Sequence, residues 1–159
     1  MRNPPRNTIA KDSINVWKMT AAIFMIFFWL CLIGVTVAWI TFEFPYGYLM
    51  VAWGIGILST YVFVFLIPKL RFKRWRYEVF EQEIYIQHGI VMRTRTLIPM
   101  IRVQHVDTKQ GPILRKFNLA SVTISTAATT HEIPALMEED ASQLRDRIST
   151  LAKVDEEDV

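Results

Sequence analysis

Cysteine is scarce in this sequence of 159 residues, and the single one, Cys31, lies inside a long apolar run. A disulfide framework needs paired cysteines and a cysteine metal site needs a cluster of them, so both are excluded. The three histidines, His88, His105 and His131, are scattered without the spacing of a metal-ligand set. A glycine-rich phosphate loop and a Gly-x-Ser-x-Gly nucleophile motif are missing as well. We therefore expect no enzyme activity, no cofactor and no metal centre.

Charge is absent from two long stretches of the chain. Asp, Glu, Lys, Arg and His are all missing from Met19 to Phe42 and again from Phe44 to Ile67. A helix rises about 1.5 Å per residue, so about 20 residues cross a hydrocarbon core of about 30 Å. Both stretches meet this length, and the segment "EFPYGY" between them has turn chemistry. The sequence therefore predicts an antiparallel transmembrane hairpin over residues 17–67. A cleaved signal peptide is the weaker alternative, because no small-x-small cleavage site follows the first stretch.

Basic residues flank the predicted hairpin on both sides. An N-terminal tail, residues 1–16, carries more Arg and Lys than acid, and the connecting loop carries Glu43 without a basic residue. Five cations follow the second stretch: Lys69, Arg71, Lys73, Arg74 and Arg76. The positive-inside rule therefore predicts a protein of the cell membrane with two spans and both termini in the cytoplasm. A transporter is disfavoured, because the spans hold no charge from which to build an ion path.

Small residues recur at helical spacing in both predicted spans. Ala52, Gly56 and Thr60 are four residues apart in the second span, and Gly34 and Ala38 form a similar pair in the first. Small side chains at this spacing let helix backbones approach closely. Packing of the two helices on each other explains the pattern most simply. A face for the transmembrane helix of a partner is the sharper alternative.

From Arg76 onward the sequence alternates with period two, which is typical of β-strands. Short strands are predicted over residues 76–80, 84–87, 90–99, 101–109, 119–127 and 131–136. In the fourth of these, Ile101, Val103 and His105 are expected on one face. Gly111 and Pro112 predict one short helical turn before the fifth strand.

The C-terminal part of the sequence predicts one amphipathic helix over residues 138–152. Acidic residues at its start suit the positive end of the helix dipole, and an apolar stripe follows at helical spacing. We therefore predict an α+β chain. It comprises the transmembrane hairpin, a basic juxtamembrane linker at residues 68–76, a small sheet or barrel domain at residues 77–152 capped by this helix, and an acidic tail at residues 153–159.

Four motifs in the polar half carry a family resemblance. They are Gly89 after the second strand, "IPMIRVQHV" from Ile98 to Val106, "GPILRKFNLASV" from Gly111 to Val122, and "STA" from Ser125 to Ala127. With them the chain resembles the bacterial membrane proteins that carry a pleckstrin-homology-like (PH-like) domain of the YdbS type. The resemblance extends over about Met19 to Ala152.

This resemblance implies a PH-like barrel capped by the C-terminal helix, preceded by a transmembrane hairpin, and no enzyme activity. As partner it implies a larger membrane protein with related PH-like domains. We take four residues of the motifs as the candidate surface of the domain: Arg102, Gln104, Gly111 and Pro112.

Two functions stay open at this point. The first is a non-catalytic integral membrane protein whose cytoplasmic PH-like domain assembles with a partner membrane protein, or with like domains, at the inner face of the membrane. The alternative is a surface domain that senses anionic lipid, with a role in envelope homeostasis or stress. The five cations of residues 69–76 motivate it, since each contributes about 1 kcal/mol near an anionic surface. Setting topology explains the same cations without a lipid role. Nucleic acid is excluded as a partner, because the spans place this basic run against a bilayer.

Overall fold

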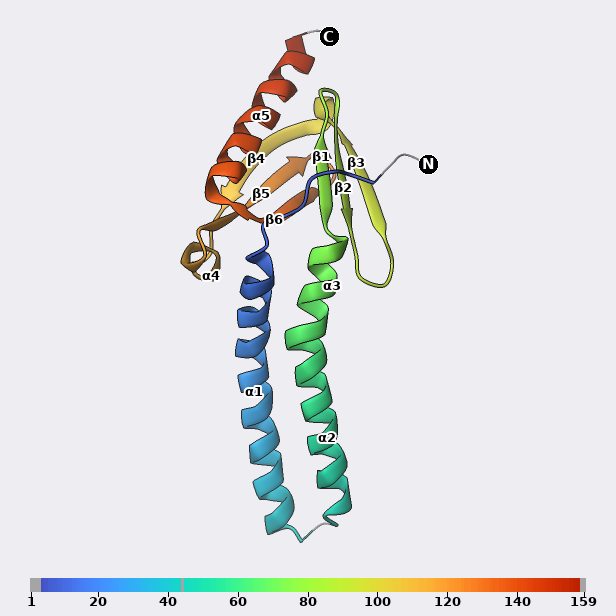
Figure 1. The fold of residues 1–159 in the computed structure, drawn as a ribbon, viewed down its shortest axis with the longest axis vertical. Coiled ribbons are helices and arrows are strands. Elements are labelled where there is room, and N and C mark those ends of the chain that lie inside the picture. The colour runs from blue at the N-terminus through green and yellow to red at the C-terminus, as the bar shows by residue number, and fades with distance from the viewer. Residues whose placement is uncertain (1–3, 44, 158–159) are drawn as a thin grey trace. The chain divides into compact units, whose positions relative to one another are not determined.

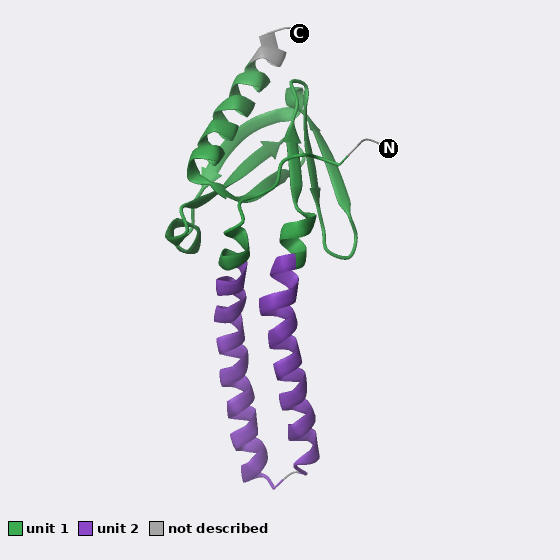
Figure 2. Ribbon diagram, in the orientation of Figure 1, with its two compact units in different colours: residues 1–16, 70–159 green, residues 17–69 purple. Residues whose placement is uncertain are grey.

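The structure is a computed structural model that describes residues 4–43 and 45–157 (Figure 1). Its elements follow in the order α1 (Ser13–Thr41), α2 (Gly47–Tyr61), the π-helical segment η1 (Val62–Leu66), α3 (Ile67–Arg74), β1 (Arg76–Val79), β2 (Glu83–His88), β3 (Thr94–Pro99), the 3-10 turn η2 (Met100–Arg102), β4 (Val103–Lys109), α4 (Pro112–Lys116), β5 (Leu119–Thr126), β6 (Thr130–Met137) and α5 (Glu138–Glu157). Two compact units result (Figure 2): unit 1 comprises Met1–Val16 and Leu70–Val159, and unit 2 comprises Trp17–Lys69.

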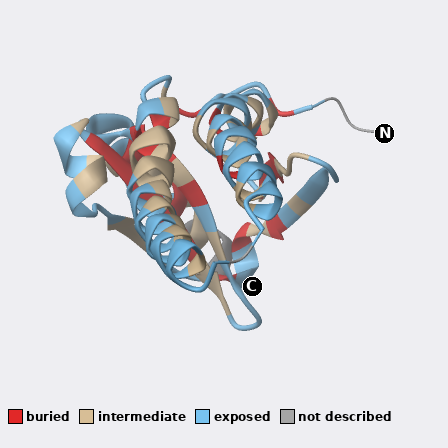
Figure 3. Ribbon diagram, turned by 90° about the horizontal axis from the view of Figure 1, so that it is seen from below, coloured by how far each residue is buried: buried red, intermediate tan, exposed pale blue. Residues whose placement is uncertain are grey.

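The apolar helices are long enough to cross a membrane and are not the core of a soluble fold. One helix is Ser13–Thr41, and the other runs without interruption from Gly47 to Arg74. Of the most apolar 18-residue stretch of each helix, 0 % and 6 % of the residues are buried. In Figure 3 exposed residues, in pale blue, occur along both helices. Apolar side chains exposed over such lengths are unfavourable in water and favourable in lipid.

Pro68 does not end the second helix, although the sequence predicted a linker from residue 68. Proline has no N–H, and its ring clashes with the carbonyl four residues earlier in a regular helix. Just before Pro68 the helix widens into η1, and the N–H of Ile67 bonds to the oxygen of Val62, five residues back. A π-turn of this kind relieves the crowding. The basic residues up to Arg74 are therefore helical, in α3.

Unit 1 contains two three-stranded antiparallel sheets, in the orders β1-β2-β3 and β4-β5-β6. The six predicted strands and the short turn α4 are present, although the third strand begins at Thr94 and not at residue 90, and α5 packs against η2, β4, β5 and β6. The α+β class is therefore confirmed. The largest buried side chains of the sheets, of η2 and of α5 form the core: Ile84, Ile86, Met100, Leu119, Val122, Ile124, Ile133 and Ile148.

One expected strand face is wrong. Ile101 lies in η2 and is 56 % exposed, Val103 is buried, and His105 is exposed. The strand begins only at Val103, and its pairing with β5 shifts register between Val103 and His105. A bulge adds one residue to a strand and so reverses the alternation of faces beyond it. Period-two reasoning has no means of locating such a residue.

The N-terminal segment packs onto the domain. Asn7 pairs with Tyr77 of β1, Ile9 is only 2 % exposed, and the N–H of Ala10 donates to the oxygen of Ala135 at 3.1 Å. Ala135 has φ +51° and lies where the pairing of β5 with β6 shifts register, so the bulge frees its carbonyl for this contact. The described part of the predicted N-terminal tail, residues 4–16, thus belongs to the same compact unit as the sheets.

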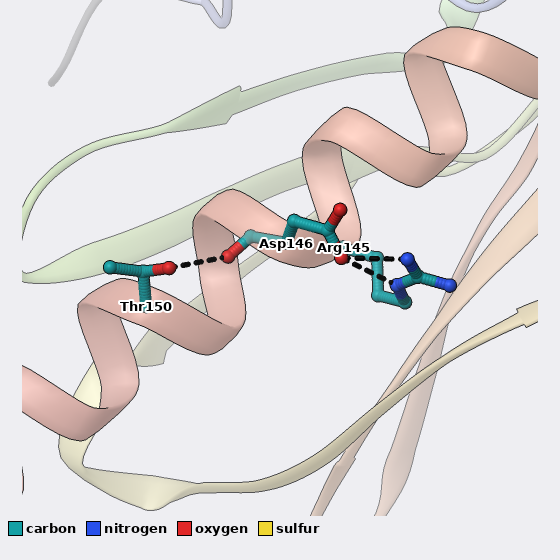
Figure 4. A network of polar contacts seen from close by, with 3 residues as sticks. All are labelled: Arg145, Asp146 and Thr150. Carbon is teal, nitrogen blue, oxygen red and sulfur yellow. Dashed lines mark hydrogen bonds and ion pairs between the residues drawn. The ribbon is translucent and has the colours of Figure 1, made fainter.

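The helix α5 extends to Glu157, past its predicted end at residue 152. Of the predicted acidic tail, residues 158–159 lie outside the described residues. On the exposed face of α5, Nε and Nη2 of Arg145 donate to Oδ1 of Asp146 at 2.9 and 2.7 Å (Figure 4). The hydroxyl of Thr150 donates to the backbone oxygen of Asp146 at 2.9 Å. Such exposed, local pairs contribute little to the free energy of folding. We therefore read this network as ordinary surface contacts of the helix and not as a site.

Candidate functional site

The predicted basic residues lie on α3 and at the start of β1. Lys69, Arg71 and Lys73 are exposed, and Arg74 and Arg76 are half-buried. Side chains four residues apart share one face of a helix, so Lys69 and Lys73 project from the same face of α3. These two lysines form an exposed pair on that face.

Arg71 differs from this lysine pair. Partial burial lowers the pKa of its guanidinium, and the negative charge of Glu132, on β6, acts in the opposite direction. The five cations that the sequence analysis grouped as one lipid contact are thus not equivalent.

A further exposed feature, missed by the sequence analysis, is the tip of the β2–β3 hairpin. The last paired residues are His88 and Thr94, and Gly89 follows with φ +109°. Ile90 follows half-buried, and the two residues after it, Val91 and Met92, are 92 % and 81 % exposed. The signal in the sequence was present, because "GIVM" places three apolar residues in a turn, where polar residues are usual.

Part of the predicted helix-packing face forms a contact between α1 and α2. Gly56 is buried, and a Cβ on it would lie 3.3 Å from Leu32 Cδ2 and 3.3 Å from Trp29 Cη2. The indole Nε1 of Trp29 donates to the hydroxyl of Thr60 at 3.1 Å. Ala52, in the same row of α2, is half-buried. The small residues of α2 therefore serve the packing of the hairpin on itself.

The small residues of α1 are placed differently. Gly34 and Ala38 are exposed, and no heavy atom lies within 4 Å of the position that a Cβ on Gly34 would take. The five residues predicted as one helix-packing face are thus divided between a packed row on α2 and an exposed pair on α1.

The candidate surface of the domain also falls into two places. Arg102, in η2, and Gln104, in β4, are exposed near the start of β4, whereas Gly111 and Pro112 are exposed at the start of α4, beyond the other end of β4. Gly111 is seven residues beyond Gln104, a distance of about 23 Å in extended chain. These four residues therefore do not form one site.

Exposed apolar residues precede Arg102 and Gln104 in the chain. Leu97 of β3 is 44 % exposed and Ile101 of η2 is 56 % exposed. Within the described residues, β3 pairs with β2 alone. We call Leu97, Ile101, Arg102 and Gln104, together with the unpaired edge of β3, the edge surface.

The remaining polar groups show no catalytic arrangement in the part of the chain that the structure describes. No group of three His, Cys, Asp or Glu side chains lies close enough to hold a metal ion. Nε2 of His105 pairs with Oδ1 of Asp107 at 3.0 Å, and both side chains are exposed. An open hollow beside the β1–β2 turn is lined by charged residues. Its two arginines are engaged structurally, because the N–H of Arg6 donates to Glu78 Oε2 at 3.3 Å and Nη2 of Arg147 donates to Val79 O at 3.4 Å.

Comparison with known proteins agrees with this architecture. The model of the family described as bacterial PH domain matches residues 15–152. Over 159 residues the chain is 51 % identical to the UPF0699 transmembrane protein YdbS of Bacillus subtilis (strain 168), and the match covers 100 % of both chains. No solved structure matches the chain significantly.

Proposed function

This chain belongs to the bacterial PH domain family and is a transmembrane protein, and from this premise we propose that its PH-like domain is a non-catalytic docking module. The hairpin of α1 and α2–α3 anchors the domain. The domain binds a PH-like domain of a larger membrane protein, or of a second copy of this chain, at the inner face of the membrane.

The edge surface carries this proposal. An unpaired strand edge presents backbone N–H and C=O groups to which a strand of another domain can add. Leu97 and Ile101, 44 % and 56 % exposed, supply apolar area beside that edge, and Arg102 and Gln104 supply a polar rim. Protein interfaces combine an apolar centre with a rim of this kind.

The placement at the inner face rests on the distribution of charge. Basic residues flank both ends of the hairpin, while the loop between the helices has Glu43 and no Lys or Arg. Tyr46 of that loop is 64 % exposed. We expect a cysteine at this position, in a Cys31→Ser background, to react with an impermeant thiol reagent in intact cells. Reaction only after the membrane is broken would reverse the orientation.

Purification of the full chain in mild detergent tests the docking role. We expect a particle that contains a second copy or another membrane protein. The double substitution Leu97→Glu and Ile101→Glu should release that partner, because two charges would replace the apolar centre of the edge surface. Met137→Glu is the matched control, since Met137 is 43 % exposed on another strand and leaves the edge surface intact.

A strictly monomeric particle without a co-purifying membrane protein would count heavily against docking. Equal loss of the partner from the edge variant and from Met137→Glu would contradict the assignment of the edge surface, while leaving docking through another face in place.

The exposed pair Lys69 and Lys73 favours a second candidate, contact with anionic lipid. In nanodiscs of anionic lipid the domain should then unfold at a higher temperature than in nanodiscs of neutral lipid. The difference should shrink at high salt and in the variant with Lys69→Gln and Lys73→Gln. Equal unfolding temperatures in neutral and anionic nanodiscs would eliminate this candidate.

A further inference from the structure

The two large apolar residues with the highest exposed fractions in the described part of the protein lie at the tip of the β2–β3 hairpin. Val91 is 92 % exposed and Met92 is 81 % exposed, whereas Met50 of α2, the most exposed large apolar residue of the membrane helices, reaches 79 %. Exposure to this degree is unfavourable in water. Neither topology nor docking through the edge surface accounts for it.

Strand register places this tip at the end of unit 1 that the chain enters from the second span. Arg76, the first residue of β1, pairs with Gln87 near the end of β2. Trp75, which joins α3 to β1, stacks on His88 with ring centroids 5.4 Å apart and planes at 19°. The hairpin thus continues past Trp75 in the direction of Leu70–Arg74. Figure 2 shows the loop and the green turns of α3 at the same end of unit 1.

The tip is long enough to reach alongside Leu70, the first residue of unit 1 after the second span. Val91 is three residues beyond His88, a reach of up to about 10 Å in extended chain. From Trp75 back to Leu70 is five helical residues, a rise of about 7.5 Å. The tip can therefore reach alongside Leu70–Arg74 of α3, and Leu70 follows the apolar run of the second span after only Pro68 and Lys69.

The tip is also held in one conformation. Gly89 has φ +109°, and a Cβ on it would lie 1.9 Å from the backbone oxygen of Met92. Only glycine fits so tight a turn, and the turn projects Val91 and Met92 beyond the ladder. Arg93 follows at once and is exposed. An arginine beside apolar side chains can extend its guanidinium to phosphate headgroups while they enter the layer below.

We propose that Val91 and Met92 insert into the interfacial layer of the same bilayer that the two helices span. The bilayer is favoured over a protein partner because the tip lies at the end of unit 1 that the chain enters from the second span, and this holds whether or not a partner is bound. Insertion gives unit 1 a third point of membrane contact, besides α1 and α3. It does not depend on the docking role, so the two proposals fail separately.

Depth-dependent quenching on the full chain tests the insertion. A Cys31→Ser protein with Met92→Cys is labelled with an environment-sensitive fluorophore and reconstituted into vesicles of phosphatidylcholine and phosphatidylglycerol. The matched control is Glu81→Cys, because Glu81 is exposed in the β1–β2 turn at the opposite end of the same sheet. We expect blue-shifted emission at position 92 and several-fold stronger quenching by nitroxide attached to lipid than at position 81. Quenching by iodide, which stays in the water, should be stronger at position 81 than at position 92.

Three results would overturn the proposal. Equal emission and equal iodide quenching at the two positions would place the tip in water. Blue-shifted emission at position 92 without quenching by lipid nitroxide would mean that protein covers the tip. Loss of the nitroxide quenching at high salt would mean that charge alone holds the tip at the surface, since apolar insertion is not screened.

Discussion

Replacing Gly56 by leucine should force α1 and α2 apart, whereas the same change at Gly54 should not. A Cβ on Gly56 would lie 3.3 Å from Leu32 Cδ2, 3.3 Å from Trp29 Cη2 and 3.4 Å from Phe28 Cε1. A Cβ on Gly54 meets no heavy atom within 4 Å. Both glycines belong to α2, so the two variants share the same change in helix propensity and in apolar volume.

The magnitude follows from that difference in space. At Gly56 the Cβ alone is tighter than ordinary van der Waals contact, and leucine adds three further carbons toward the same wall. Overpacking of this kind costs about 1–3 kcal/mol. Replacement of glycine within a helix stabilises the helix by up to about 1 kcal/mol at either position. The two variants should therefore differ by about 1–3 kcal/mol in the stability of the packed hairpin.

Near-ultraviolet circular dichroism of the full chain in mixed micelles measures this difference as a denaturing detergent is added. The ring centroids of Trp29 and Trp53 are 5.3 Å apart, so separation of the helices changes the aromatic signal while the helices themselves persist. We expect Gly56→Leu to lose the signal at a lower detergent fraction than Gly54→Leu. Coincident transitions of the two variants would refute the packing argument.

Three further predictions concern unit 1. Ile9→Ala should destabilise the domain by about 2–5 kcal/mol, because a side chain only 2 % exposed is truncated; thermal unfolding of the full chain measures this, and an unchanged midpoint would contradict docking of the N-terminal segment. Gly89→Ala should cost on the order of 1–3 kcal/mol through backbone strain, whereas Gly111→Ala, with open space at its Cβ, should be close to neutral in the same assay. Burial, reinforced by the negative charge of Asp140, raises the pKa of Tyr77 above its ordinary value of 10.0. The associated stability is complete below pH 10.0 and is lost as the pH rises through the raised pKa, so unfolding temperatures above that pH should fall less steeply in Tyr77→Phe, and parallel curves would contradict the assignment.

The elements of this protein could be predicted from the sequence because each has a strong local pattern. The charge-free stretches around Cys31 and Gly56 require a membrane, and the alternation on either side of Gly89 requires strands. The family resemblance then indicated how those strands assemble into a PH-like domain. These inferences depend on neighbouring residues alone, or on spaced motifs, and the structure agrees with them.

The candidate site was less predictable because it depends on contacts between distant parts of the chain. Ile9 lies in a short polar segment, and its burial accompanies long-range contacts of its neighbours, namely Asn7 with Tyr77 and Ala10 with Ala135. The exposure of Leu97 follows from β3 being an edge strand, which period-two alternation does not reveal. Gly34 and Gly56 look alike in sequence, and only the packing of α1 on α2 distinguishes the exposed glycine from the buried one.

Site-specific photo-crosslinking from position 97 in native membranes tests the docking role most directly. A photoreactive residue in place of Leu97, in the full chain, should form an adduct with a PH-like domain of another membrane protein or of a second copy. The same residue in place of Met137, which is equally exposed, should form little or none. Absence of an adduct at position 97, or equal adducts at both positions, would contradict docking through the edge surface.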